Sequence, residues 1–164
     1  MTGRQLSVVF LVSCLISLSL ATPQAYGQAT EGQSKTELSL YDRLGGVYSI
    51  ATVVDDFIER LLVNDILNAN PAIKEARDRV PRAGLKFSVT ALVCQVTGGP
   101  QQYTGRSMKD SHAHLNITEK EWQAMLADFG ATLGKFNVPQ KEQGELIAIV
   151  ESTKKDIVMA AASK

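Results

Sequence analysis

The amino-acid sequence predicts an all-α protein. From Ser39 onward, apolar residues recur every three or four positions, which is the spacing of one helix face. No segment of this region alternates polar and apolar residues between turn signals, as a half-buried strand would. Caps and breaks at short intervals divide the region into helices, so we expect residues 39–164 to form one helical domain around a single core.

Two helices are expected at the start of this domain. Ser39, with the acidic Asp42 three positions later, is typical of a helix cap, and Gly45-Gly46 ends the short helix that it opens. The longer helix that follows ends at Asn64. Its apolar side consists of Ile50, Val53, Val54, Phe57, Leu61 and Leu62.

The middle of the domain carries a charged segment and a further helix. Asn70-Pro71 is typical of a cap with proline in the first turn, and it opens the charged segment 73–80, which Pro81 interrupts. The helix after Pro81 ends in the glycine-rich turn 98–100. Its apolar residues at helical spacing are Leu85, Val89, Leu92 and Val96.

An irregular stretch follows, with one short helical turn from Ser107 to His112. Thr118 and Glu121 then form a capping box that opens an amphipathic helix. The inward side of that helix consists of Trp122, Met125, Leu126, Phe129 and Leu133. After a break at Val138-Pro139, a last helix is expected from the spacing of Leu146, Val150, Thr153 and Ile157.

A secretory signal peptide is expected over residues 1–27. Arg4 is followed by an uncharged, apolar stretch over 6–21 and then by a small, polar linker, and this order is typical of exported proteins. Small residues allow cleavage after Ala21 or after Gly27, and we favour Gly27, which leaves a linker at 28–38. The signal peptide implies transport across the inner membrane, so the protein is expected in the periplasm.

Two alternatives for the N-terminus stay open: an uncleaved membrane anchor and a lipoprotein processed at Cys14. The lipoprotein is disfavoured because the residues after Cys14 stay apolar, whereas a lipidated chain usually turns polar at once. Removal of the first segment leaves Cys94 as the only thiol, so no internal disulfide can form. We expect Cys94 to be a buried apolar residue.

Charge and ligand counts exclude several functions. Seventeen Lys and Arg balance seventeen Asp and Glu, which leaves no basic surface for a nucleic acid. Two cysteines and two histidines are too few for a zinc finger or an iron–sulfur cluster. His112 and His114 cannot share a helix face, so at most one of them is a metal ligand. From composition alone, two exposed loop histidines are the simpler interpretation.

Two sequence motifs resemble those of the group I truncated haemoglobins. They are LYDRLGG at Leu40–Gly46 and GGPQQYTGRSMKDSHAHLNIT at Gly98–Thr118, and with the spacing between them the resemblance covers about residues 40–158. It implies a truncated globin, in which a two-over-two helical sandwich encloses haem b.

The resemblance also implies roles for single residues. His112 matches the proximal histidine that binds the haem iron, and Met108, four positions earlier, lies on the same side of a helical turn. His114 then has no role at the iron. The positions that match residues lining the haem in this family are Tyr103, Met108, Ile117, Trp122, Met125 and Phe129.

The chain departs from the family on the distal side of the expected haem, where a gas ligand binds. Phe57 is followed by Ile58, where the family usually has a tyrosine, and Val89 replaces a residue that is often glutamine. Leu85 and Val93 occupy neighbouring pocket positions, so the distal pocket is expected to be mostly apolar. The hydroxyl groups that could compensate are those of Tyr48, Ser88 and Thr90.

The resemblance implies reversible binding of a diatomic ligand (O2, NO or CO), in oxygen transport or in NO detoxification. The missing hydrogen bond to O2 costs about 1.5–3 kcal/mol, which favours NO or CO binding, sensing or redox chemistry over O2 storage. An NO dioxygenase-type activity with an electron-donating reductase stays open. The alternatives are a haem carrier or small redox protein in the periplasm, and a helical interaction domain without cofactor. A monomer is expected.

Overall fold

The structure of the protein is a computed structural model that describes residues 37–159. The described residues belong to one compact unit. The predicted signal peptide at 1–27 and the linker as far as residue 36 lie outside the described residues. Between residues 37 and 159 the chain is all-helical, as predicted, with no strand.

Nine helices are found in the described part of the chain. In order they are α1 (Leu40–Arg43), α2 (Gly46–Val63), α3 (Asp65–Asn68), α4 (Pro71–Arg79), α5 (Arg82–Val96), α6 (Met108–His112), α7 (Glu119–Lys135), α8 (Gln140–Ser152) and α9 (Lys154–Ile157). Three of them begin at predicted caps, namely Ser39, Asn70 and Thr118. Ser39 Oγ accepts the N–H of Asp42 at 3.1 Å, and Thr118 and Glu121 form the capping box.

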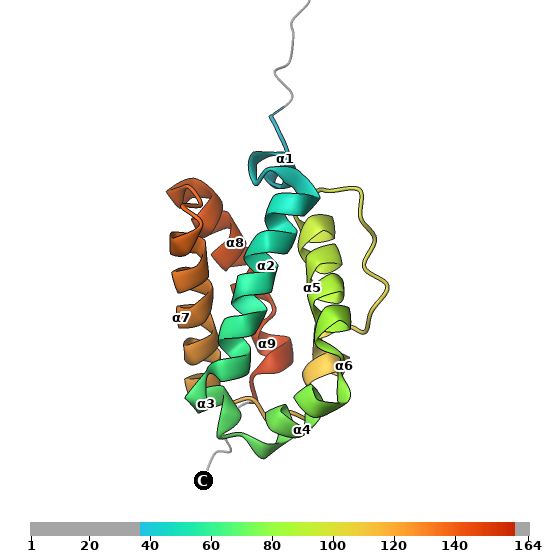
Figure 1. Cartoon of the computed structure of the whole chain (residues 1–164), viewed down its shortest axis with the longest axis vertical. Helices are drawn as coiled ribbons and strands as arrows, with labels where there is room; N and C mark the ends of the chain where they lie inside the picture. The colour runs from blue at the N-terminus through green and yellow to red at the C-terminus, as the bar shows by residue number, and fades with distance from the viewer. Residues whose placement is uncertain (1–36, 160–164) are drawn as a thin grey trace, which may run out of the picture. The chain divides into compact units, whose positions relative to one another are not determined.

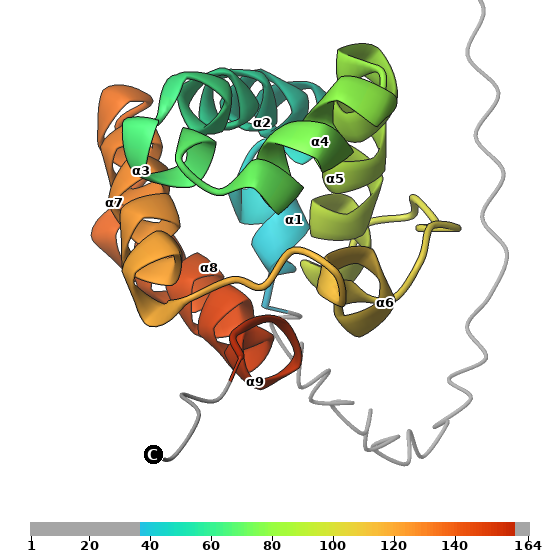
Figure 2. The ribbon, with the colours of Figure 1, turned by 90° about the horizontal axis from the view of Figure 1, so that it is seen from below.

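The long helices are arranged around α2. This helix packs against α5 on one side and against α7 on the other, so α5 and α7 lie on opposite sides of it (Figure 1, Figure 2). α8 joins α7 through a shared hydrophobic core cluster. The pair α2 and α5, over the pair α7 and α8, is the predicted two-over-two arrangement.

The core consists of two neighbouring clusters of buried side chains. The first combines α1, α7 and α8 through Leu40, Phe129, Leu133 and Leu146. The second combines α2 and α5 through Ile50, Val54, Ile58 and Cys94. Phe57 and Val93 pack against both clusters and join them. Cys94 is fully buried, as predicted, and burial raises the pKa of its thiol, which keeps it protonated and unreactive.

Ion pairs connect helices that are distant in the sequence. Arg43 on α1 lies 2.9 Å from Glu142 on α8. Asp56 on α2 accepts hydrogen bonds from Lys135 on α7 and from Arg60 on its own helix. The bond from Lys135, followed by that from Arg60, lowers the pKa of Asp56 to about 2. These pairs hold α2 and α7, and α1 and α8, in register.

The last predicted helix is broken in two. The apolar spacing predicted one helix through Ile157, but α8 ends at Ser152 and α9 begins at Lys154. The N–H of Thr153 bonds to the carbonyl of Val150 at 3.0 Å, and Thr153 Oγ1 donates to the same carbonyl at 2.7 Å. Because these bonds reach three residues back instead of four, the α-helix stops here.

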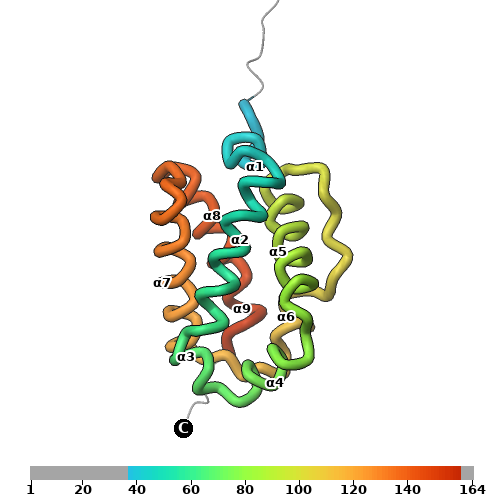
Figure 3. Tube along the Cα trace, viewed as in Figure 1, coloured from blue at the N-terminus to red at the C-terminus, as the bar shows by residue number. Residues whose placement is uncertain are grey.

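The segment between α5 and α6 has no helix of its own. Figure 3 shows that it runs back along α5. The N–H of Tyr103 donates to Gln95 Oε1 on α5 at 2.6 Å, which fixes the segment to that helix. Separately, none of the helices between residues 37 and 159 is long and apolar enough to cross a membrane.

Candidate functional site

α6 carries His112 at its last position. The helix begins after Ser107, whose Oγ accepts the N–H of Asp110 at 3.0 Å. His112 is half-buried, whereas His114, two residues later, is exposed. The structure therefore distinguishes the two histidines that composition alone leaves equivalent.

The imidazole of His112 has a fixed orientation. Its Nδ1 lies 2.8 Å from the carbonyl oxygen of Met108. A carbonyl oxygen only accepts hydrogen bonds, so Nδ1 carries the proton and donates it, and Nε2 of the neutral ring keeps its lone pair. Histidines that bind metals are generally oriented in this way, through a hydrogen bond from the other ring nitrogen.

A metal ion at His112 would need most of its ligands from a non-protein group. No cluster of three or more His, Cys, Asp or Glu side chains suited to a metal ion occurs between residues 37 and 159. His112 also has no hydrogen bond at Nε2 to any residue in that range. A single oriented imidazole suits a macrocyclic cofactor that supplies its own ligands to the metal.

The predicted distal residues are brought together where α2 meets α5. Ile58 is 3% exposed and belongs to the second core cluster. The other four distal residues pack against that cluster and are half-buried; they are Phe57, Leu85, Val89 and Val93. They form an apolar wall that is only partly covered by the protein. Of the described helices, only α2 is in extensive contact with α5, and only α9 is in extensive contact with α6.

α7 contributes a second group of predicted residues. The ring of Phe129 lies 5.2 Å from that of Phe57, centroid to centroid, and so connects α7 to the distal wall. Met125 is half-buried, while Ile117, just before α7, and Trp122 are buried. The indole N–H of Trp122 has no hydrogen-bond partner among the described residues. A buried N–H without an acceptor is uncommon in native proteins.

Tyr103 forms hydrogen bonds with the segment before α6 and with α5. Its hydroxyl donates to the carbonyl of Arg106 at 2.7 Å, and its ring covers Gly105, where a Cβ would approach the Tyr103 hydroxyl oxygen to 2.3 Å. Glycine is therefore required under the ring. The hydrogen-bond partners of Tyr103 are Gln95 on α5 and Arg106 before α6. Within residues 37–159, no hydrogen bond joins Tyr103 to His112.

The three hydroxyl groups that could compensate for an apolar pocket have different surroundings. Tyr48 is 87% exposed, so its hydroxyl is in solvent. The hydroxyl of Thr90 donates to the carbonyl of Lys86 at 2.7 Å and is already used. The side chain of Ser88 is half-buried, and its hydroxyl forms no hydrogen bond with another described residue.

Asn70 is a structural neighbour of the site that sequence reasoning missed. Its Oδ1 accepts the N–H of Ala72 at 2.9 Å, as the predicted cap requires. Its Nδ2 also donates to the carbonyl of Leu115 at 2.8 Å, three residues after His112. The Asn-Pro pattern predicts the cap, but no sequence signal predicts the bond to Leu115 across 45 positions.

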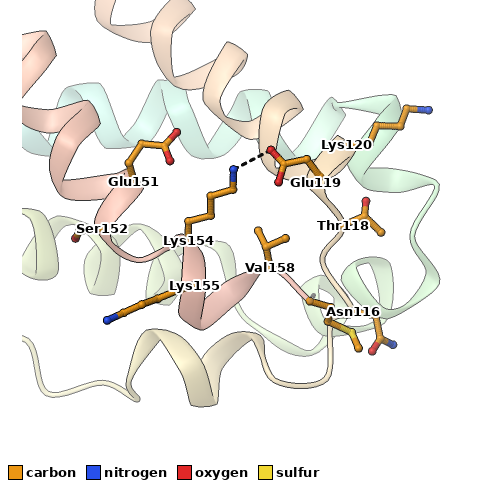
Figure 4. Close-up of a pocket in the computed structure, with 10 residues that line it drawn as sticks. Asn116, Thr118, Glu119, Lys120, Glu151, Ser152, Lys154, Lys155 and Val158 are labelled. Carbon is orange, nitrogen blue, oxygen red and sulfur yellow. Dashed lines mark hydrogen bonds and ion pairs between the residues drawn. The ribbon is translucent and has the colours of Figure 1, made fainter. Parts of the chain in front are cut away.

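A pocket of about 1160 Å³ lies where the start of α7 meets α9 (Figure 4). Its lining includes Glu119 and Lys154, whose side chains form an ion pair at 2.8 Å, and Val158. A smaller pocket of about 320 Å³ lies between α2 and the segment after α7. Neither contains any of the residues predicted to contact haem.

Known proteins resemble this chain in sequence and in fold. Group 1 truncated hemoglobin GlbN of Synechocystis is 30% identical over 115 residues, which is 68% of this chain and 88% of the relative. The crystal structure of truncated hemoglobin from Tetrahymena pyriformis in the Fe(III) form matches with a TM-score of 0.63 at 23% identity, over 75% of this chain and 100% of that one.

The 2/2 hemoglobin from Synechococcus, solved in the cyanomet state with covalently attached heme, matches with a TM-score of 0.62 at 24% identity, over 74% of this chain and 98% of that one. These solved structures show the same fold. In addition, residues 39–159 match the family model described as bacterial-like globin, and this range includes every residue predicted at the haem. The chain therefore belongs to the bacterial-like globin family and, within it, to the truncated hemoglobins.

Proposed function

We propose that this protein holds haem b through His112 and reversibly binds a diatomic ligand. Haem b is the cofactor of the globin family to which the chain belongs. The observation that carries the assignment to His112 is the 2.8 Å contact between its Nδ1 and the Met108 carbonyl, which leaves Nε2 available to iron.

The residues predicted to line the haem suit a flat, largely apolar cofactor. Leu85, Val89 and Val93 on α5 keep apolar surface that the protein covers only in part. Burial of such surface contributes about 25 cal/mol per Å², so covering it with an apolar macrocycle is favourable. Met108 and Met125 are half-buried as well, and methionine adapts readily to an irregular apolar surface.

When bound, haem b supplies an iron with one open position for O2, NO or CO. The chain orients the His112 imidazole through Met108, and the apolar side chains of α2 and α5 would exclude water from a bound ligand. Ile58 and Val89 offer no hydrogen-bond donor there. This lack supports NO or CO binding, sensing or redox chemistry over tight O2 storage, because a bound O2 that accepts no hydrogen bond loses about 1.5–3 kcal/mol of stabilisation.

The assignment of His112 is tested by the absorption spectra of the purified protein and of two matched variants. The wild-type chain is expected to show a Soret band in the ferric, ferrous and CO-bound forms. His112→Ala should lose the haem or retain it weakly, whereas His114→Ala should keep it, because His114 is exposed. Equal loss of haem in both variants would remove His112 from its proposed role.

Export to the periplasm is part of the same proposal. It rests on Arg4 and on the uncharged, apolar stretch over 6–21, with cleavage after Gly27. The reaction partners proposed with it are a diatomic gas and an electron-donating reductase, and the protein is proposed to act as a monomer. A native protein that began with Met1 on N-terminal sequencing would contradict the cleavage and the release that it implies.

A further inference from the structure

α9 packs against α6, the helix that carries His112. Both views of the ribbon show α9 between α8 and α6 (Figure 1, Figure 2). α6 has only five residues. Isolated helices shorter than about 12 residues are marginal in water, so the position of α6 depends on its packing partners. Among the described helices, α9 is its one extensive partner.

Met159 forms a backbone hydrogen bond with the segment that joins α6 to α7. The N–H of Met159 donates to the carbonyl of Ile117 at 3.0 Å. Ile117 lies five residues after His112 and directly before the cap of α7. The C-terminal chain therefore contacts α6 and also fixes the segment through which α6 continues into α7.

A side-chain pair provides a third attachment. Lys154 Nζ lies 2.8 Å from Glu119 Oε1, in the first turn of α7 (Figure 4). The bond from Lys154 is the main cause of the lowered pKa of Glu119, so the carboxylate stays charged and paired at neutral pH. Exposed pairs of this kind are weak individually, but this one acts together with the backbone bond and with the packing of α9.

We infer that residues 154–159 form a C-terminal clasp that positions His112 for iron. This inference rests on the proposed function, because it concerns the same histidine. The break at Thr153 is what makes the clasp possible, since the chain leaves the α8 direction there and turns toward α6. Loosening the clasp should let α6 move and should weaken the hold of His112 on the cofactor.

The backbone bond can be removed with a matched pair of variants. Met159→Pro eliminates the N–H donor, whereas Met159→Ala keeps it and removes the same side chain. Proline requires an extended residue before it, and Val158 already has φ −81° and ψ 127°. The backbone of Val158 therefore already has the conformation that a proline at position 159 requires.

Three measurements on the full-length protein as purified decide the inference. Amide hydrogen exchange over residues 108–117 should be faster in Met159→Pro than in Met159→Ala. The transfer of haem to excess apomyoglobin should be about fivefold faster, the effect of losing one hydrogen bond. The iron–histidine stretching band in the resonance Raman spectrum of the ferrous form should also shift or broaden in the proline variant alone.

Lys154→Ala and Lys155→Ala form a second matched pair. Lys155 is exposed and has no ion pair with another described residue. Faster exchange and faster haem transfer are expected for Lys154→Ala only, and Lys154→Arg should restore both. This pair decides the inference if circular dichroism shows that the proline variant has lost helix.

The failure of the clasp and the failure of the haem assignment give different results. If the wild-type chain binds no haem, the proposed function fails, while the exchange rates still report whether the clasp holds α6. If haem is bound through His112 but exchange and haem transfer are the same in Met159→Pro and Met159→Ala, and in Lys154→Ala and Lys155→Ala, the clasp is wrong.

Discussion

Replacing Ile58 by tyrosine should slow the dissociation of O2 from the haem-loaded protein. Ile58 is 3% exposed and lies in the core cluster against which Leu85 and Val89 pack, so a phenol at this position enters the same apolar pocket. A hydroxyl that donates to the partly charged ligand contributes about 1.5 kcal/mol, which corresponds to roughly tenfold slower dissociation. Adding Val89→Gln supplies a second donor and should strengthen the effect.

The matched control for this change is Ile58→Phe. Both aromatic rings are larger than isoleucine and should cost about 1–3 kcal/mol of stability through overpacking, but only tyrosine has the hydroxyl. Stopped-flow displacement of O2 by CO measures the dissociation rate directly. The reasoning is refuted if Ile58→Phe slows O2 release as much as Ile58→Tyr. It is also refuted if the wild type already releases O2 as slowly as the tyrosine variant; Ser88→Ala would then test whether that hydroxyl is the unrecognised donor.

Three further predictions concern the scaffold. The bonds from Lys135 and then Arg60 lower the pKa of Asp56 to about 2. Asp56 therefore contributes stability that is complete above its usual pKa of about 3.9 and is lost as the pH falls through 2. Asp56→Asn should lower the urea midpoint at pH 7 and should flatten the loss of stability below pH 4. At Gly99 a Cβ would lie 2.4 Å from the Tyr41 ring, so Gly99→Ala should cost about 1–3 kcal/mol in the same assay. Gly84→Ala, in a helix with nothing within 4 Å, should instead stabilise by about 0.4–1 kcal/mol, and destabilisation there would contradict the packing described.

Local sequence signals predicted most of the helices. The capping box at Thr118 and Glu121 depends on residues three positions apart, and the glycines at 45 and 46 act through their own backbone. Such signals are complete within one turn of chain. The break at Thr153 was not predicted, because the apolar spacing continues across it and only the hydrogen bonds to Val150 show that the helix stops.

The candidate site could be predicted from sequence only in part. The motif around His112 identified the family, and the apolar residues at Ile58 and Val89 were found by their departure from it. The bond from Asn70 to Leu115 and the packing of α9 on α6 depend on how distant segments meet, and no periodicity encodes them. Composition alone did not distinguish His112 from His114, whereas their burial in the structure does.

Chemical rescue of a cavity variant tests the role of His112 most directly. His112→Gly removes the imidazole that the Met108 carbonyl orients. We expect the purified variant to lack the wild-type ferrous spectrum and to regain it when imidazole is added, with the CO-bound Soret band restored at the wild-type position. His114→Gly should need no imidazole. A His112→Gly protein that keeps haem and the wild-type spectrum without imidazole would contradict the account.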